Sequence, residues 1–210
     1  MQRELMQELE FRSSVDGAQD HDIILRAVDR MMGEDRHAAR RAKLPVAHIP
    51  KVLYHWRCYE GSTSENPESK RYAYEAGKRA VEDFLKAREY QAEVVHTCHL
   101  GFFRVNYQPD LLSNRPDTAV VGGKLIDRHN RVVGGIYNEN REPLYLGLHK
   151  EYSGYMHRAS CQQEAYAVDV RCMICSGEAQ TVWEELTGLP YAVQPHTGYF
   201  LYQDVLKKDA

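Results

Sequence analysis

Histidine, cysteine and glutamate residues in the second half of the chain have the types and spacing of a metal site. His149-x-Glu151 is followed, after twenty intervening residues, by Cys172-x-x-Cys175. Imidazole nitrogens and thiolates are the ligands that zinc takes in proteins, and a carboxylate beside a metal-bound water can move protons. The order of these motifs therefore indicates zinc chemistry.

This order resembles that of the zinc-dependent cytidine and deoxycytidylate deaminases, which use a His-x-Glu motif and a Cys-x-x-Cys motif. The resemblance covers about residues 118–190. It implies that His149, Cys172 and Cys175 would bind zinc and leave one position open for water. Glu151 would then be the catalytic residue that carries a proton to the departing ammonia. The implied activity is hydrolysis of a cytosine or adenine compound.

Three features depart from the deaminase pattern. Arg171 precedes the first cysteine, where that family has proline. The two motifs lie closer together than in that family. The segment after His149 contains Gly154 and few aliphatic residues, which is a poor composition for a buried central helix.

Two other interpretations of the same residue types stay open. A structural zinc ion takes four ligands in a closed tetrahedron, and His96, Cys98 and His99 could supply them together with Cys172 and Cys175. Alternatively, no metal is bound, and the two cysteines are small thiols that pack at the end of a strand.

The composition is that of a globular protein with nearly balanced charge. The 210 residues include 27 basic and 30 acidic side chains, for a net charge of -3 at pH 7. This balance excludes the overall basic footprint of a nucleic-acid-binding protein. A local basic patch remains at Arg36, Arg40, Arg41 and Lys43. No apolar run approaches the ~20 residues of a membrane span, and no apolar signal core is present, so we expect no membrane partner and no secretion through a signal peptide.

The hydrophobic spacing changes character after about residue 92. Apolar residues at helical spacing favour helices before that point, over residues 1–12, 21–33, 50–61 and 69–90. Alternating and β-branched runs favour strands after it, over residues 94–107 and 164–174, with a hairpin turn near 127–130 and a helix over 177–189.

The predicted fold class is therefore α+β. A helical N-terminal part, residues 1–92, precedes a mostly antiparallel β part, residues 93–210, which has one C-terminal helix. These parts are either two domains or one α+β domain whose helices cover one face of a sheet.

A second resemblance lies in the N-terminal half. Its pattern is a Val-Ala-x-Ile-Pro step, an aliphatic residue, a tryptophan and a Glu-Gly pair, carried by Val46, Ala47, Ile49, Pro50, Val52, Trp56, Glu60 and Gly61. This segment resembles one in small structural and assembly proteins of tailed bacteriophages. The resemblance covers about residues 20–95, and the chain departs from it by a longer loop at 62–69 and by the whole β-rich half.

The phage resemblance implies a viral structural protein, located in the virion or the host cytoplasm, that works by protein–protein docking and not by catalysis. Its partners would be other virion proteins or copies of itself. Trp56, Tyr59 and Tyr72 are the interface candidates, since aromatic rings are enriched at interfaces. This docking function, with no favoured cofactor, is the leading hypothesis. The zinc-dependent deaminase is the alternative, and a small zinc-stabilised module without activity is a third.

Overall fold

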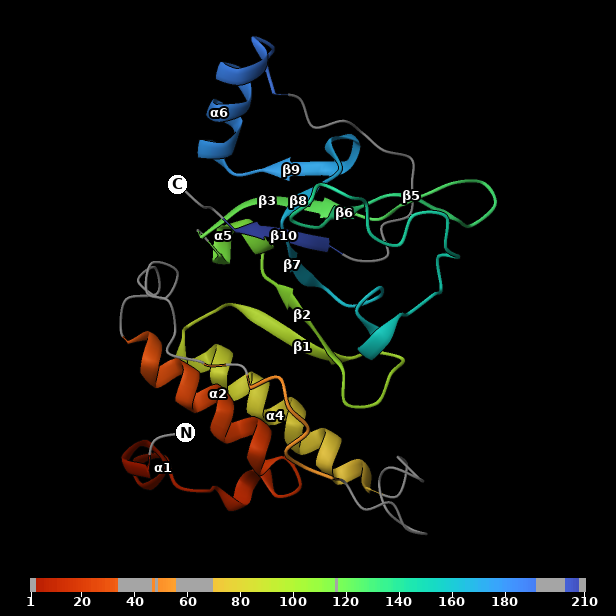
Figure 1. Ribbon diagram of the computed structural model, residues 1–210. Coiled ribbons are helices and arrows are strands. Elements are labelled where there is room, and N and C mark those ends of the chain that lie inside the picture. Colours follow the sequence, from red (N-terminus) through yellow and green to blue (C-terminus); the bar gives the residue numbers. More distant parts are fainter. Residues whose placement is uncertain are drawn as a thin grey trace. The chain divides into compact units, whose positions relative to one another are not determined.

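A computed structural model describes residues 3–33, 47, 49–55, 70–115 and 117–191, together with the backbone of residues 203–207. The chain divides into two compact units, Met1–Gln108 and Pro109–Ala210 (Figure 1). Helices and one hairpin form the first unit, and small sheets with a C-terminal helix form the second. The predicted α+β class is confirmed.

Several predicted interaction residues lie outside the described residues. These are the interface candidates Trp56 and Tyr59 and the basic patch of Arg36, Arg40, Arg41 and Lys43. Tyr72, the third interface candidate, lies on the surface with 54% of its area exposed.

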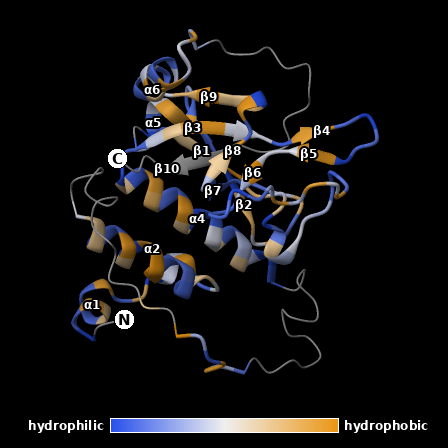
Figure 2. Cartoon of the chain, turned by 45° about the horizontal axis from the view of Figure 1, so that its top comes forward, coloured by the Kyte–Doolittle hydropathy of each residue, from blue (hydrophilic) through white to orange (hydrophobic). Residues whose placement is uncertain are grey.

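Three helices of the first unit correspond to helices predicted from apolar spacing. They are α1 (Arg3–Leu9), α2 (Gln19–Met32) and α4 (Arg71–Ala87), and a short 3-10 helix, η1 (Ser13–Val15), lies between the first two. Figure 2 shows hydrophobic and hydrophilic residues in alternation along α2 and α4, as expected for helices with one buried face.

The core between η1, α2 and α4 is built from small side chains. Its buried residues are Val15, Ala18, Ala76 and Ala80, with Leu25 packed against them. Alanines carry only a methyl group, so α4 can approach η1 and the start of α2 closely.

A hairpin completes the first unit. Strands β1 (Ala92–His96) and β2 (Phe103–Tyr107) pair antiparallel, and α4 packs against β1. The chain reverses at Gly101, whose φ of 80° suits glycine. Because the hairpin packs on α4, the boundary between the units falls after residue 108, beyond the change of character near residue 92.

Strand β3 (Thr118–Gly123) is the centre of the second unit. It pairs antiparallel with β9 (Met173–Cys175) on one side and with β10 (Gln203–Lys207) on the other. Strand β7 (Gln163–Ala165) then adds in parallel to β10. The sheet order is therefore β7-β10-β3-β9, with mostly antiparallel neighbours (Figure 1).

Shorter elements surround this sheet. Two small antiparallel pairs join β4 (Leu125–Ile126) to β5 (Val132–Gly134), and β6 (Ile136–Tyr137) to β8 (Ala167–Val168). The predicted turn near 127–130 connects β4 and β5, although β3 itself pairs elsewhere. The single-turn helix α5 (Leu111–Asn114) precedes β3.

Helix α6 (Gly177–Thr187) follows β9 and agrees with the helix predicted over 177–189. The Ser176 side chain caps its first turn by accepting a bond from the Ala179 N–H, and Gly188 ends it in the left-handed conformation. None of the helices among the described residues is long and apolar enough to cross a membrane.

Two local predictions are corrected by the structure. Residues 50–55, expected to begin a helix at Pro50, are not helical; the rest of that predicted helix lies outside the described residues. The strand expected over 164–174 is interrupted, because the 3-10 helix η4 (Val170–Cys172) lies between β8 and β9. Asp169 caps η4 by accepting a bond from the Arg171 N–H, which turns the chain out of the strand.

We expect the close approach of β3 and β8 to make Gly122 intolerant of a side chain. A Cβ atom at Gly122 would lie 2.5 Å from the Cβ of Val168. Gly122→Ala should lower the free energy of unfolding by about 1–3 kcal/mol, measured by urea denaturation. The control is Gly177→Ala, whose new Cβ meets nothing within 4 Å and which should match the wild type. Equal stability of both variants would refute this packing.

Candidate functional site

The residues of the predicted zinc site lie in different surroundings. His149 and Glu151 are exposed, and the Glu151 N–H makes a long bond of 3.4 Å to His149 Nδ1. Cys172 at the end of η4 and Cys175 at the end of β9 are buried. The histidine and glutamate thus face solvent, whereas the cysteines belong to the packed interior of the second unit.

The surroundings of Cys175 favour a neutral thiol. Burial raises the pKa of this thiol, and a hydrogen bond with Tyr191 opposes that rise only in part. A zinc ligand must be a thiolate, which burial in apolar surroundings disfavours. In the part of the chain that the structure describes, no group of three or more His, Cys, Asp and Glu residues could hold a metal ion.

The other proposed ligands belong to the first unit. His96 lies on β1, where its Nε2 is 2.9 Å from the Glu75 carboxylate and its ring contacts Phe103 edge-on. Cys98 is an exposed free thiol in the hairpin turn. Both zinc hypotheses therefore stay predictions that rest on the sequence motifs.

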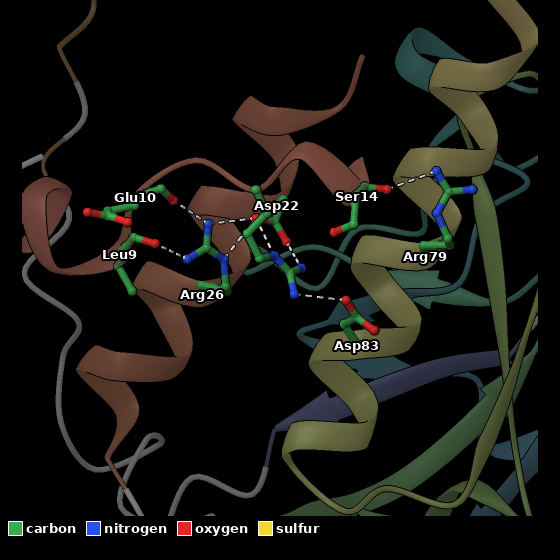
Figure 3. A network of polar contacts seen from close by, with 8 residues as sticks. Leu9, Glu10, Ser14, Asp22, Arg26, Arg79 and Asp83 are labelled. Carbon is green, nitrogen blue, oxygen red and sulfur yellow. Dashed lines mark hydrogen bonds and ion pairs between the residues drawn. The ribbon is translucent and has the colours of Figure 1, made fainter. Parts of the chain in front are cut away.

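Among the described residues, a cluster of charged groups surrounds Asp22 in the first unit (Figure 3). The first turn of α2 places this carboxylate in the interior, with 2% of the side chain exposed. Arg26, one turn later on α2, donates to Asp22 Oδ2 over 2.8 Å. Arg12 donates to both carboxylate oxygens, over 3.2 Å to Oδ2. Two guanidinium groups thus neutralise one buried carboxylate.

The same arginines reach the neighbouring elements. Arg26 donates to the backbone carbonyls of Leu9 and Glu10 at the end of α1. The other end of the Arg12 guanidinium lies 3.0 Å from Asp83 on α4. The Asp22 cluster, defined as Asp22 with Arg12, Arg26 and Asp83, therefore joins α1, α2 and α4, as Figure 3 shows.

The electrostatics of this cluster suit a structural role. Burial raises the pKa of Asp22, but hydrogen bonds from Arg12 and Arg26 and their positive charges outweigh burial and lower it overall. Asp22 is therefore ionised near neutral pH, and a carboxylate held so firmly as an anion is a weak general base. The role of Asp22 is therefore to hold α1, α2 and α4 together.

A second cluster of charged groups lies in the second unit and was not predicted from the sequence. Asp169 is buried at the start of η4, and Arg171 donates to its two oxygens over 2.9 and 2.7 Å. Arg171 also donates to the Val133 carbonyl on β5. The Tyr137 hydroxyl on β6 donates to Asp169 over 3.3 Å. The Asp-x-Arg spacing was the only sequence signal for this cluster, because its other members are distant along the chain.

The Asp169 cluster also holds its carboxylate as an anion. The hydrogen bond from Arg171 lowers the pKa of Asp169 against the opposing effect of burial. Burial and the Asp169 charge raise the pKa of Tyr137, so its hydroxyl stays protonated. The cluster fixes β5, β6 and η4 to one another, and more than half of the Arg171 side chain faces solvent.

A buried lysine fixes the long loop of the second unit. Lys124 follows β3 with only 2% of its area exposed, and its ammonium group donates to the carbonyl of Ala159. The pattern Gly-Gly-Lys gave no sign of this burial. Lys124 thus ties the end of β3 to the loop residues near 159.

Comparison with known proteins adds one partial relative. No family model matches the chain, and no solved structure matches it. The uncharacterized protein y4gI of Sinorhizobium fredii (strain NBRC 101917 / NGR234) is 41% identical over 75 residues. The match covers 36% of this chain and 7% of the relative, so most of that relative lies outside the similarity.

We expect Asp22→Asn to destabilise the first unit by about 3–5 kcal/mol at neutral pH, because Arg12 and Arg26 would lose their buried counter-charge. Asp22 has a lowered pKa when folded, so its stabilising effect is present above the unfolded-state pKa and is lost as pH falls through the folded-state value. The difference between variant and wild type should therefore shrink in acid.

Urea denaturation between pH 3 and pH 7 measures this difference. The control is Glu8→Gln, which removes the ion pair of Glu8 with Arg30, both more than half exposed, and should change stability little. A pH-independent loss for Asp22→Asn, or an equal loss in the control, would contradict the role of the cluster.

We expect purified protein to contain no stoichiometric zinc, because the exposed His149 and the buried Cys175 lie in different surroundings. Mass spectrometry of protein prepared without chelator measures the metal content, with His149→Ala and Cys172→Ser as variants. About one zinc per chain, lost in both variants, would overturn this expectation and support the deaminase arrangement. Zinc lost only in Cys172→Ser would support a structural site.

Proposed function

We propose that this chain is a non-catalytic docking component that assembles with copies of itself in a larger particle. The observation that carries the proposal is the apolar face of α6. This helix has no buried residue, and Val182 and Leu186 on one face are 51% and 81% exposed. Leu189 beyond its end is also mostly exposed. An amphipathic helix normally covers such a stripe against another element.

Exposed apolar groups continue next to this helix. Ile174 on β9, the edge strand that precedes α6, is 45% exposed. Apolar side chains from a strand and its following helix provide the hydrophobic centre that a stable interface needs. We name Val182, Leu186, Leu189 and Ile174 the α6 surface.

The charged groups support a structural rather than a catalytic role. The carboxylates of Asp22 and Asp169 are each held as anions by arginines, which leaves them poorly suited to proton transfer. No observation among the described residues favours the deaminase over docking. The resemblance of residues 20–95 is the support for a tailed-phage virion as the particle, and virion proteins are then further partners.

We expect the purified chain to self-associate as its concentration rises, measured by light scattering after size-exclusion chromatography. Leu186→Glu should weaken this association at least tenfold, because it places a charge on the exposed apolar face of α6. Its stability should match the wild type, since the side chain is exposed.

The matched control is Thr181→Glu, which introduces the same residue on another face of α6. Thr181 is exposed and bonds only locally, to the carbonyl of Gly177. Association that is equally weakened by both variants, or a wild-type chain that stays monomeric at every concentration, would contradict the proposal.

A further inference from the structure

The hairpin of the first unit leaves the outer edge of β2 without a partner strand. Strands β1 and β2 form a two-stranded sheet, so among the described strands β2 pairs only with β1 (Figure 1). The Gln108 N–H donates to the Gln91 carbonyl at the end of this pairing. Inward and outward bonding alternate along an antiparallel strand. Phe103, Val105 and Tyr107 therefore direct their N–H and C=O groups away from β1.

The outer edge of β1 is less accessible than that of β2. Val94, in the middle of β1, is only 2% exposed, and α4 packs against this strand. Val105, which lies opposite Val94 on β2, is only half-buried. The neighbouring Arg104 is exposed. Another strand can therefore reach the hairpin at β2.

The sequence of β2 is complementary to itself. Two antiparallel copies related by a two-fold axis at Val105 place Phe103 of each chain opposite Tyr107 of the other. Arg104 then lies opposite Asn106 of the second copy, whose amide oxygen can accept a hydrogen bond from the guanidinium. Aromatic pairs across strands are stabilising, and like charges directly opposite are destabilising. A shift of the axis to Arg104 would bring two arginines together, so the charges favour the register centred on Val105.

The two faces of the hairpin also suit a longer sheet. Phe103 lies on the face towards α4, where a Cβ atom on Gly77 would be 3.3 Å from its ring. Glu93 and Arg104 are exposed on the opposite face. Antiparallel sheets commonly have one covered and one solvated face. A two-fold axis perpendicular to the sheet keeps the covered faces of both copies on the same side.

We propose that β2 pairs antiparallel with β2 of a second copy of this chain and forms a continuous sheet of order β1-β2-β2-β1. A second copy fits as the partner because the strand is complementary to itself in charge and in side-chain size. A single two-fold contact closes at a dimer, so an assembly of many copies needs a further contact besides the α6 surface. The inference rests on the proposed function and adds this second contact.

Disulfide trapping in the full chain tests the register. Arg104→Cys and Asn106→Cys are combined in a Cys98→Ser background, because Cys98 is an exposed free thiol. In the proposed sheet the two new thiols of different chains lie opposite each other in a non-hydrogen-bonded pair. The Cα atoms of such a pair are about 4.5 Å apart, which allows a disulfide. We expect a covalent dimer after mild oxidation, measured on a non-reducing gel.

The matched control places two thiols at the same spacing on β1, with Glu93→Cys and Val95→Cys in the same background. It should give at least tenfold less covalent dimer, because the edge of β1 lies outside the proposed contact. Equal trapping in both variants would overturn the inference. So would trapping in the β2 variant that does not exceed that of Cys98→Ser alone.

A second measurement separates this contact from the α6 surface. In the Leu186→Glu chain, the dimer that remains in light scattering reports pairing through β2. Adding Val105→Pro should weaken that dimer at least tenfold, because proline removes an outward N–H and leaves the bonds to β1 in place. A Leu186→Glu chain that is monomeric at every concentration, while the wild type associates, would overturn the inference and leave the proposed function standing. A wild-type chain that never associates would overturn both.

Discussion

One buried negative charge sets the arrangement of the first unit. Asp22 is removed from water, and Arg12 and Arg26 must both remain beside it, because an unpaired carboxylate in that position would be costly. Arg26 is held in this position by the backbone carbonyls at the end of α1, to which it donates. Arg12 is held by its ion pair with Asp83 of α4. The charged cluster thus acts together with the apolar core between η1, α2 and α4 to position these helices.

The second unit consists mainly of short strands, and buried polar side chains also position its backbone. The described strands are two to six residues long, and β3 and β10 each pair on both sides with strands that lie far away in the sequence. The buried side chains of Asp169 and Lys124 fix loops to these strands where little regular structure is available. Both units therefore use buried, hydrogen-bonded polar side chains to position the backbone.

Amphipathic spacing and end signals made the helices predictable. Helix α6 has its cap at Ser176 and its stop at Gly188, and α2 ends at Gly33, so local sequence determines both. Strand partners were not predictable, because the pairing of β3 with β9 depends on contacts between residues such as Val121 and Ile174. The hairpin turn predicted near residues 127–130 is present, but it joins only the short strands β4 and β5. The helix predicted from Pro50 was wrong for residues 50–55, which are neither helical nor part of a strand.

The candidate site was less predictable than the fold. Sequence motifs identified four candidate site residues by type: His149, Glu151, Cys172 and Cys175. The motifs did not indicate that the first two are exposed and the two cysteines buried. Asp22 was not predicted as part of a charge cluster, because nothing local in the sequence indicates that Arg12 folds back onto it. Charge clusters of this kind arise from long-range packing, which one sequence does not encode in any short pattern.

Tyr191 has a consequence for how this sheet can grow. Its hydroxyl accepts the N–H of Cys175 and donates to the carbonyl of Met173, two main-chain groups of the edge strand β9. The Ser176 N–H, one position further, turns the other way and bonds to Ala119 of β3, so the groups that Tyr191 occupies are those on the outer side of β9. A single phenol thereby occupies two of the bonding positions that another strand would need. Sheet extension is closed at this edge, and any neighbour that approaches β9 must be held by side chains and not by continuous backbone pairing.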